Sequence, residues 1–174
     1  MKPWNVLVTS LLGQERSVYR ELRQACDFRR TDFKDVYLGW TDDMEAFLSA
    51  VLTNAFLKER IGKAVPIEQT FSFHAEDFEE KLEGVLITYL PRLAGSRFHV
   101  RMERRGFKGR LNSLEIEQEM DRLLKERLVE AGKGCEIDFE DPDDILVVET
   151  VADWCGVSLI TRDMKEKYPF IKVR

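Results

Sequence analysis

The sequence predicts a mixed α/β protein of the α+β class. Short apolar runs typical of buried strands alternate with segments whose apolar residues recur every three or four positions, as in helices that pack on a core. The composition, 44% hydrophobic and 34% charged residues, is that of a globular chain, and 174 residues can form one large domain or two small ones. A long helical pattern gives way to a strand pattern near residues 62–66, so we predict domains at residues 1–65 and 66–174.

The first predicted domain begins with a strand over residues 6–8 and a helix over 18–26. Residues 27–40 fit two short strands as well as one strand and a loop. The clearest helical pattern covers residues 44–56, with Thr41 or Asp42 placed to cap the helix. Alternation of apolar and polar residues then predicts a strand over 65–73.

The second predicted domain starts with a helix over residues 75–90 that Pro91 ends. Phe98, Val100 and Met102 alternate with polar residues, which predicts a half-exposed strand. A helix follows the loop 106–111, with Asn112 as its cap, and it ends at the glycines of residues 132–134. Three strands are predicted at the end, over 135–139, 145–151 and 154–161, before a short charged tail over 162–174.

Bulk charge argues against a nucleic-acid partner. The chain has 27 Lys or Arg and 32 Asp or Glu residues, a formal net charge of −5. Its three cysteines lie far apart, which indicates neither a disulfide framework nor a zinc site. No apolar stretch approaches a membrane span of roughly 18 residues, and residues 1–10 lack the pattern of a secretory signal. We therefore expect a cytoplasmic protein with no membrane partner.

Residues 97–110 are the exception, because basic residues are concentrated there. This segment carries six Lys or Arg residues and one Glu, a formal charge of +5, so the rest of the chain carries −10. Such a concentration suits the neutralisation of a polyanionic backbone. The strand pattern places Arg97, Arg101 and Arg105 on one face, and a glycine-flanked loop delivers further cations to a helix start, which attracts phosphate. The predicted RNA-contacting residues are Arg97, His99, Arg101, Arg104, Arg105, Phe107, Lys108 and Arg110.

Each of these assignments has a structural alternative. The arginines would equally form a solvated face paired with nearby carboxylates. Phe107 could stack on an unpaired base, but packing against its own loop is the simpler role. His99 lies on the basic face and could touch RNA, whereas His74 is most simply a cap or surface residue.

Catalytic and metal-binding patterns are weak. Residues 136–153 are rich in carboxylates that could bind magnesium or act as acid and base, yet the run from Asp141 to Asp144 is typical of a turn. The chain has no nucleophile elbow, phosphate loop, dinucleotide fingerprint or deaminase motif. We therefore predict no catalytic residues, no metal site and no cofactor.

The run SRFHVRMERRGFKGRLNSLEIEQEMDRLL, followed by EIDFEDPDDILVVETVADWCGVSL, resembles a THUMP domain. In that family a basic strand and helix are followed by an aspartate-rich turn and two closing strands. The earlier segments NVLVTSLLGQERSVYREL and AVPIEQT resemble the ferredoxin-like domain that precedes THUMP in standalone proteins similar to the tRNA-acetylation accessory proteins. The resemblance implies a ferredoxin-like N-terminal domain followed by a THUMP α/β domain.

The same resemblance implies RNA binding, most often of tRNA. THUMP domains commonly work beside an appended catalytic module, and we expect no room for one in a chain that ends at Arg174. The resemblance therefore implies a non-catalytic protein that presents tRNA to a separate tRNA-modifying enzyme, an RNA cytidine acetyltransferase if the chain follows the accessory proteins. Two other classes stay open. One is a protein-interaction module that uses the acidic strands, and the other is a small enzyme that uses His99 with Glu103 or Glu149.

Overall fold

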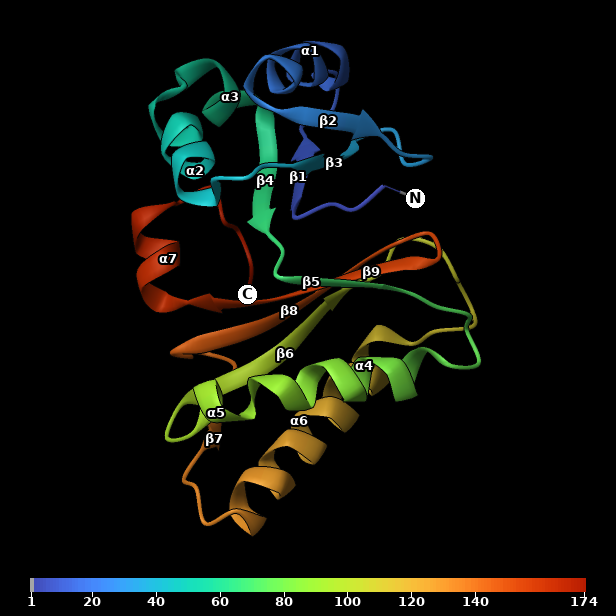
Figure 1. Cartoon of the computed structure of the whole chain (residues 1–174), viewed down its shortest axis with the longest axis vertical. Coiled ribbons are helices and arrows are strands. Elements are labelled where there is room, and N and C mark those ends of the chain that lie inside the picture. The colour runs from blue at the N-terminus through green and yellow to red at the C-terminus, as the bar shows by residue number, and fades with distance from the viewer. Residues whose placement is uncertain (1) are drawn as a thin grey trace. The chain divides into compact units, whose positions relative to one another are not determined.

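The computed structural model describes residues 2–174, and Met1, which the first predicted domain includes, lies outside them. The chain forms two compact units (Figure 1). The first comprises residues 2–67 together with Asp163–Lys172, and the second comprises Glu68–Arg162 together with Val173–Arg174. The predicted ranges, 1–65 and 66–174, differ from these units chiefly because the segment Asp163–Lys172 joins the first one.

The first unit is a four-stranded antiparallel sheet with helices between its strands. Its strand order is β2-β3-β1-β4. This is the β-α-β-β-α-β arrangement of a ferredoxin-like fold, as the resemblance to standalone THUMP proteins implies. Its elements are β1 (Val6–Ser10), α1 (Glu15–Ala25), β2 (Asp27–Arg30), β3 (Val36–Trp40), α2 (Met44–Thr53), α3 (Ala55–Arg60) and β4 (Ile61–Pro66).

The predicted helix over 44–56 is two helices, because Asn54 interrupts it. Asn54 has an extended backbone, with φ −92° and ψ 92°. Its N–H donates to Val51 O at 3.1 Å and its side-chain oxygen accepts from Leu57 N at 3.0 Å. It therefore ends α2 and caps α3. Asp43, rather than Thr41 or Asp42, caps α2. Residues 27–40 form two strands, the first of the two alternatives.

The second unit is a five-stranded mixed sheet with strand order β5-β9-β8-β6-β7. The strand β6 runs parallel to both β7 and β8, and the other pairs are antiparallel. Its elements are β5 (Gln69–Ser72), α4 (Phe78–Leu86), the 3₁₀ turn η1 (Ile87–Tyr89), α5 (Leu90–Leu93), β6 (Arg97–Glu103), α6 (Ser113–Glu130), β7 (Glu136–Ile137), β8 (Asp144–Val151) and β9 (Trp154–Thr161).

The single strand predicted over 65–73 is wrong, because the chain changes sheets within it. Ile67 N donates to Asn5 O at 2.8 Å in the first unit, whereas Glu68 N donates to Val157 O at 3.0 Å in the second. The predicted helix over 75–90 is also interrupted. Pro91 does not end it but lies in the first turn of α5, where a missing N–H costs nothing.

One face of the second sheet carries the core of that unit, and the helices α4 and α6 lie side by side against it (Figure 1). Phe98, Val100 and Met102 of β6 are each at most 4% exposed, as predicted, but His99, predicted on the opposite, exposed face, is also buried at 3%, so the alternation fails there. The three apolar residues pack with residues of both helices and of β8 and β9, among them Phe78, Leu82, Leu86, Ile116, Met120, Leu124, Leu146, Val148 and Val157.

The tail predicted as merely charged packs into the first unit. It contains α7 (Arg162–Lys167), and Phe170 and Ile171 are 5% and 1% exposed. Ala64 N in β4 donates to Phe170 O at 3.0 Å, so the segment is held by a backbone contact as well as by apolar burial. Within residues 2–174, no helix has both the length and the apolar character needed to cross a membrane.

Candidate nucleic-acid interface

The basic segment folds as the strand β6 followed by an ordered loop over residues 104–112. Gly106, Phe107 and Gly109 have positive φ angles of 99°, 52° and 78°. The loop is tied to the β8–β9 hairpin, since Arg105 N donates to Thr150 Oγ1 at 2.9 Å and Arg105 O accepts from Ala152 N at 3.1 Å. These contacts hold a non-glycine residue, Phe107, in the left-handed region at some conformational cost.

The loop leads into α6, and an open pocket of about 510 Å³ lies at this helix start. Asn112 caps the helix as predicted, because its Oδ1 accepts from Leu114 N at 3.1 Å and from Glu115 N at 3.4 Å. Two of the free N–H groups that would attract phosphate are therefore already used. The pocket is lined by Glu79, Arg104, Gly109, Arg110, Leu111, Asn112, Ser113, Glu115 and Ile116.

Two of the predicted cations keep an uncompensated charge. Lys108 is exposed at the loop, and neither it nor Arg104 has a carboxylate within 4 Å in the part of the chain that the structure describes. The Arg104 guanidinium donates to Gly106 O, which stiffens the loop without neutralising the cation.

Arg101 and Arg110 form ion pairs at the surface. Arg101 Nη1 lies 3.8 Å from Glu117 Oε1, with 56% of the arginine side chain exposed. Arg110 pairs with Glu76, and their side chains are 56% and 73% exposed. The Arg110–Glu76 pair is exposed on both sides, and such pairs contribute at most about 1 kcal/mol, so phosphate can replace this carboxylate. In the other pair only the arginine is exposed, since the Glu117 side chain is 10% exposed.

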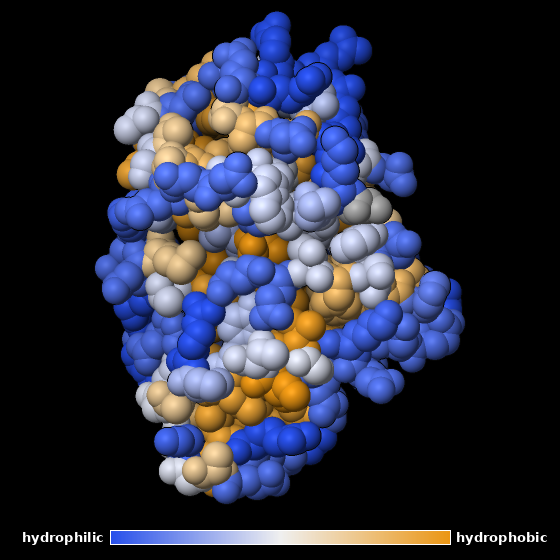
Figure 2. All heavy atoms as spheres, viewed as in Figure 1, coloured by the Kyte–Doolittle hydropathy of each residue, from blue (hydrophilic) through white to orange (hydrophobic). Residues whose placement is uncertain are grey.

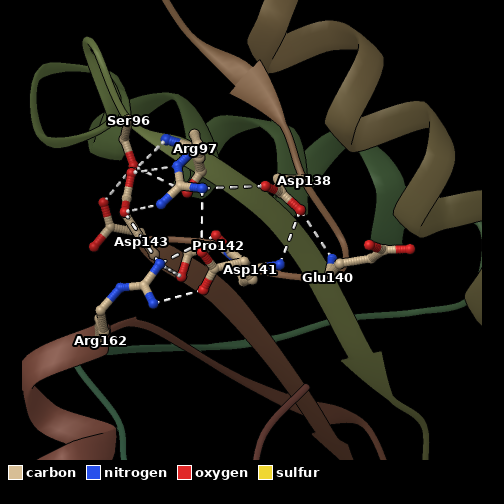
Figure 3. A network of polar contacts seen from close by, with 9 residues as sticks. Ser96, Arg97, Asp138, Glu140, Asp141, Pro142, Asp143 and Arg162 are labelled. Atoms are coloured by element: carbon tan, nitrogen blue, oxygen red, sulfur yellow. Dashed lines mark hydrogen bonds and ion pairs between the residues drawn. The ribbon is translucent and has the colours of Figure 1, made fainter.

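Arg97, by contrast, is held within the aspartate-rich turn (Figure 3). Its guanidinium lies 3.0 Å from Asp143 Oδ1, 3.3 Å from Asp141 Oδ2 and 3.6 Å from Asp138 Oδ2, and Arg162 pairs with the first two aspartates. Hydrogen bonds from Arg97 lower the pKa of Asp143 to about 2. The turn is therefore a structural ion-pair network, and among residues 2–174 no cluster of side chains is suited to a metal ion.

Arg105 is part of a buried ion pair. Its Nη1 donates to Glu149 Oε2 at 2.6 Å and its Nη2 to Glu103 Oε1 at 2.5 Å. Only 9% of the Arg105 side chain and 1% of the Glu149 side chain are exposed. Arg105 lies past the end of β6, so it does not extend the exposed face that the strand pattern predicts, and its guanidinium acts within the fold.

The two predicted ring contacts are also occupied by packing. His99 is 3% exposed, with its Nδ1 3.2 Å from Val100 O and its ring centroid 5.2 Å from that of Phe139. The Phe107 ring lies 5.1 Å from the Phe73 ring and joins the apolar core. Of the residues in the enzyme hypothesis, His99 and Glu149 are buried, at 3% and 0% exposed, whereas the side chain of Glu103 is 52% exposed.

Sequence reasoning missed two carboxylates that close the free edge of β6. Glu117 Oε1 accepts from Met102 N and Asp121 Oδ1 from Val100 N, both at 2.7 Å. Both acids belong to α6 and are at most 8% exposed. Burial raises the pKa of Asp121 to about 7. The sequence signal that could have revealed this role is the spacing of the two acids. They are four residues apart and therefore lie on the same face of α6, beside its apolar residues.

Comparisons with known proteins bear on the fold. No family model matches the sequence, and no curated protein matches it significantly. Solved structures do match. TrmN from Thermus thermophilus has a TM-score of 0.62 at 19% identity over 88% of this chain, and PH1313 from Pyrococcus horikoshii OT3 has 0.57 at 13% over 91%. A 4-thiouridine synthetase in complex with RNA and ATP has 0.55 at 18% over 91%. The chain has a THUMP-like fold.

The THUMP-like fold covers only part of each of these proteins. The matched region is 55% of the PH1313 chain, 44% of the TrmN chain and 41% of the 4-thiouridine synthetase chain. The likeness therefore extends over most of this chain and about half of each larger one. At sequence identities this low, it concerns the fold alone.

Proposed function

We propose that the chain is a non-catalytic RNA-binding protein that binds tRNA and presents it to a separate tRNA-modifying enzyme in the cytoplasm. The observation that carries the proposal is the THUMP-like fold shared with a synthetase that was solved in complex with RNA. On the resemblance to the tRNA-acetylation accessory proteins, the enzyme served is an RNA cytidine acetyltransferase. The protein itself needs no cofactor for this role.

The loop over residues 104–112 gives the proposal local support. It presents Lys108 and Arg104 without acidic partners, and Arg110 in an exposed pair that phosphate can displace. On the neighbouring strand β6, the Arg101 side chain is 56% exposed. Phosphate contacts from such groups position a nucleic acid without reading its sequence. We therefore expect shape-dependent, salt-sensitive binding.

The test is the salt dependence of tRNA affinity in single charge-removal variants. Arg101→Gln and Lys108→Gln should each lower the slope of log affinity against log salt concentration by about 0.7–0.9, the value for one phosphate contact. Lys125→Gln is the matched control, because Lys125 is an exposed cation of α6 outside the loop. Unchanged slopes in both the β6 variant and the loop variant, with the fold intact, would remove β6 and the loop from the RNA-binding surface.

The presenting role needs a second measurement. The protein should co-purify from its native cells with tRNA and with a modifying enzyme, and ribonuclease treatment separates contacts made through RNA from direct ones. Recovery of a protein partner with no tRNA, together with no tRNA binding by the pure protein, would instead support the protein-interaction module.

A further inference from the structure

We propose that the first unit carries a second RNA-backbone contact on α1 and β2. We call it the α1 arginine surface and define it as Arg16, Arg20, Arg23 and Arg30. This inference rests on the proposed function, since it assigns a further surface to the same ligand. It differs from the loop of residues 104–112 in both its elements and its chemistry.

The helix geometry places three of these arginines in a line. Arg16, Arg20 and Arg23 are spaced by four and three residues, which puts them on one face of α1. They span roughly 10 Å along the helix at 1.5 Å per residue. Val18 and Leu22 are buried on another face, so packing of the helix leaves the arginine line exposed.

The charge of this surface is not neutralised by the protein. Across residues 2–174, no carboxylate lies within 4 Å of any of the four guanidinium groups. The acids of α1 are engaged elsewhere: Glu15 pairs with Lys34 at 3.2 Å, and Glu21 accepts from Asn54 Nδ2 at 3.1 Å. The predicted segment 97–110 carries more formal charge, but carboxylates pair with most of its arginines.

An aromatic stack holds part of the surface in place. The Arg30 guanidinium carbon lies 4.5 Å from the centroid of the Tyr19 ring, and that of Arg23 lies 5.9 Å away. Tyr19 in turn stacks on buried Tyr37, with centroids 5.6 Å apart and planes at 19°. A guanidinium fixed in this way keeps its donors free for a bidentate contact with phosphate.

The chemistry favours RNA over an acidic protein. Protein interfaces are usually centred on buried apolar anchors, and in the described chain none of the large exposed apolar residues belongs to α1 or β2. Figure 2 shows strongly hydrophilic residues gathered at the top of the view, where α1 lies in Figure 1. Leu11 and Leu12, 45% and 91% exposed, lie in the turn before α1 and outside the arginine line. A line of exposed arginines is typical of backbone contacts to a polyanion.

The test removes three charges from α1 and, as a matched control, three from α6. The variants are R16Q/R20Q/R23Q and R122Q/K125Q/R127Q, both checked by circular dichroism, and the probe is fluorescently labelled tRNA titrated at several salt concentrations. We expect the α1 variant to lower the salt slope by about 2, at roughly 0.7 per contact, and to weaken affinity at least tenfold near physiological salt. The α6 variant should leave the slope unchanged.

The outcomes separate this inference from the proposed function. If the wild type binds tRNA and the α1 variant keeps its slope, the α1 arginine surface is wrong and the proposed function stands. If the wild type does not bind tRNA, both fail. Equal losses of tRNA affinity in the two triple variants would show that only the net charge matters, and would refute the proposed contact on α1. If polyglutamate displaces labelled tRNA as effectively as unlabelled tRNA does, the surface is assigned to an acidic polypeptide instead.

Discussion

Arg105 should matter for stability and not for RNA affinity. Arg105→Met removes a guanidinium that is 9% exposed and leaves Glu149, 1% exposed, without its closest cation. The backbone contacts of Arg105 to Thr150 and Ala152 survive the substitution, so the change isolates the ion pair. Removing one partner of a buried pair costs about 3–5 kcal/mol, and we expect a loss of that size in the free energy of unfolding.

Native-state hydrogen exchange of the β8 and β9 amides is the assay, because it reports on the second unit alone. Arg110→Met is the control: both side chains of its pair with Glu76 are exposed, so it should cost less than about 1 kcal/mol. The double variant R105M/E149M should recover part of the loss, since no carboxylate is then left buried beside the missing cation. A loss below about 1 kcal/mol in Arg105→Met, joined to weakened tRNA binding, would refute the buried-pair assignment.

Two carboxylates give further predictions. Burial raises the pKa of Asp121 to about 7, so the folded state binds its proton more tightly than the unfolded state and stability falls as pH rises from about 4 to 7. Urea denaturation should show a loss of about 2–3 kcal/mol from pH 5 to 8 that Asp121→Asn reduces, and equal losses in both proteins would contradict the assignment. Arg97→Gln should let the pKa of Asp143, now about 2, rise toward its ordinary value near 4 in an NMR titration. Asp77 serves as the unchanged control there, and a persistently low Asp143 pKa would show that Arg162 alone suffices.

Local patterns in the sequence correctly predict features that depend only on residues within the same strand or helix. The inward-facing residues of β6 and the cap of α6 at Asn112 are predicted correctly because each depends only on neighbouring residues, whereas the burial of His99 depends on residues far along the chain, such as Phe139. The break at Asn54 was missed, since the apolar spacing of residues 44–56 continues through it. Only the extended backbone of that residue reveals two helices.

The candidate site was harder to predict because the partners of its cations lie far along the chain. The arginines of residues 97–110 could be located in the sequence, but the carboxylates that pair with them lie on other elements. The parallel register of β6 and β8 places Glu103 opposite Glu149, and both pair with Arg105. The α1 arginine surface was overlooked for the converse reason. When the charges of this segment are added up, Glu15 and Glu21 offset part of the arginine charge. In the structure their side chains contact Lys34 and Asn54 and not the arginines.

The edge of β6 has a consequence for self-association. The strand pairs with β7 only at Arg97 and Phe98, so beyond that point its outer side would be a template for a strand from another molecule. Glu117 and Asp121 occupy the N–H groups of Met102 and Val100 on that side. An incoming strand would have to displace both carboxylates and leave them buried, so the same side chains that fasten α6 to the sheet also guard the protein against edge-to-edge aggregation.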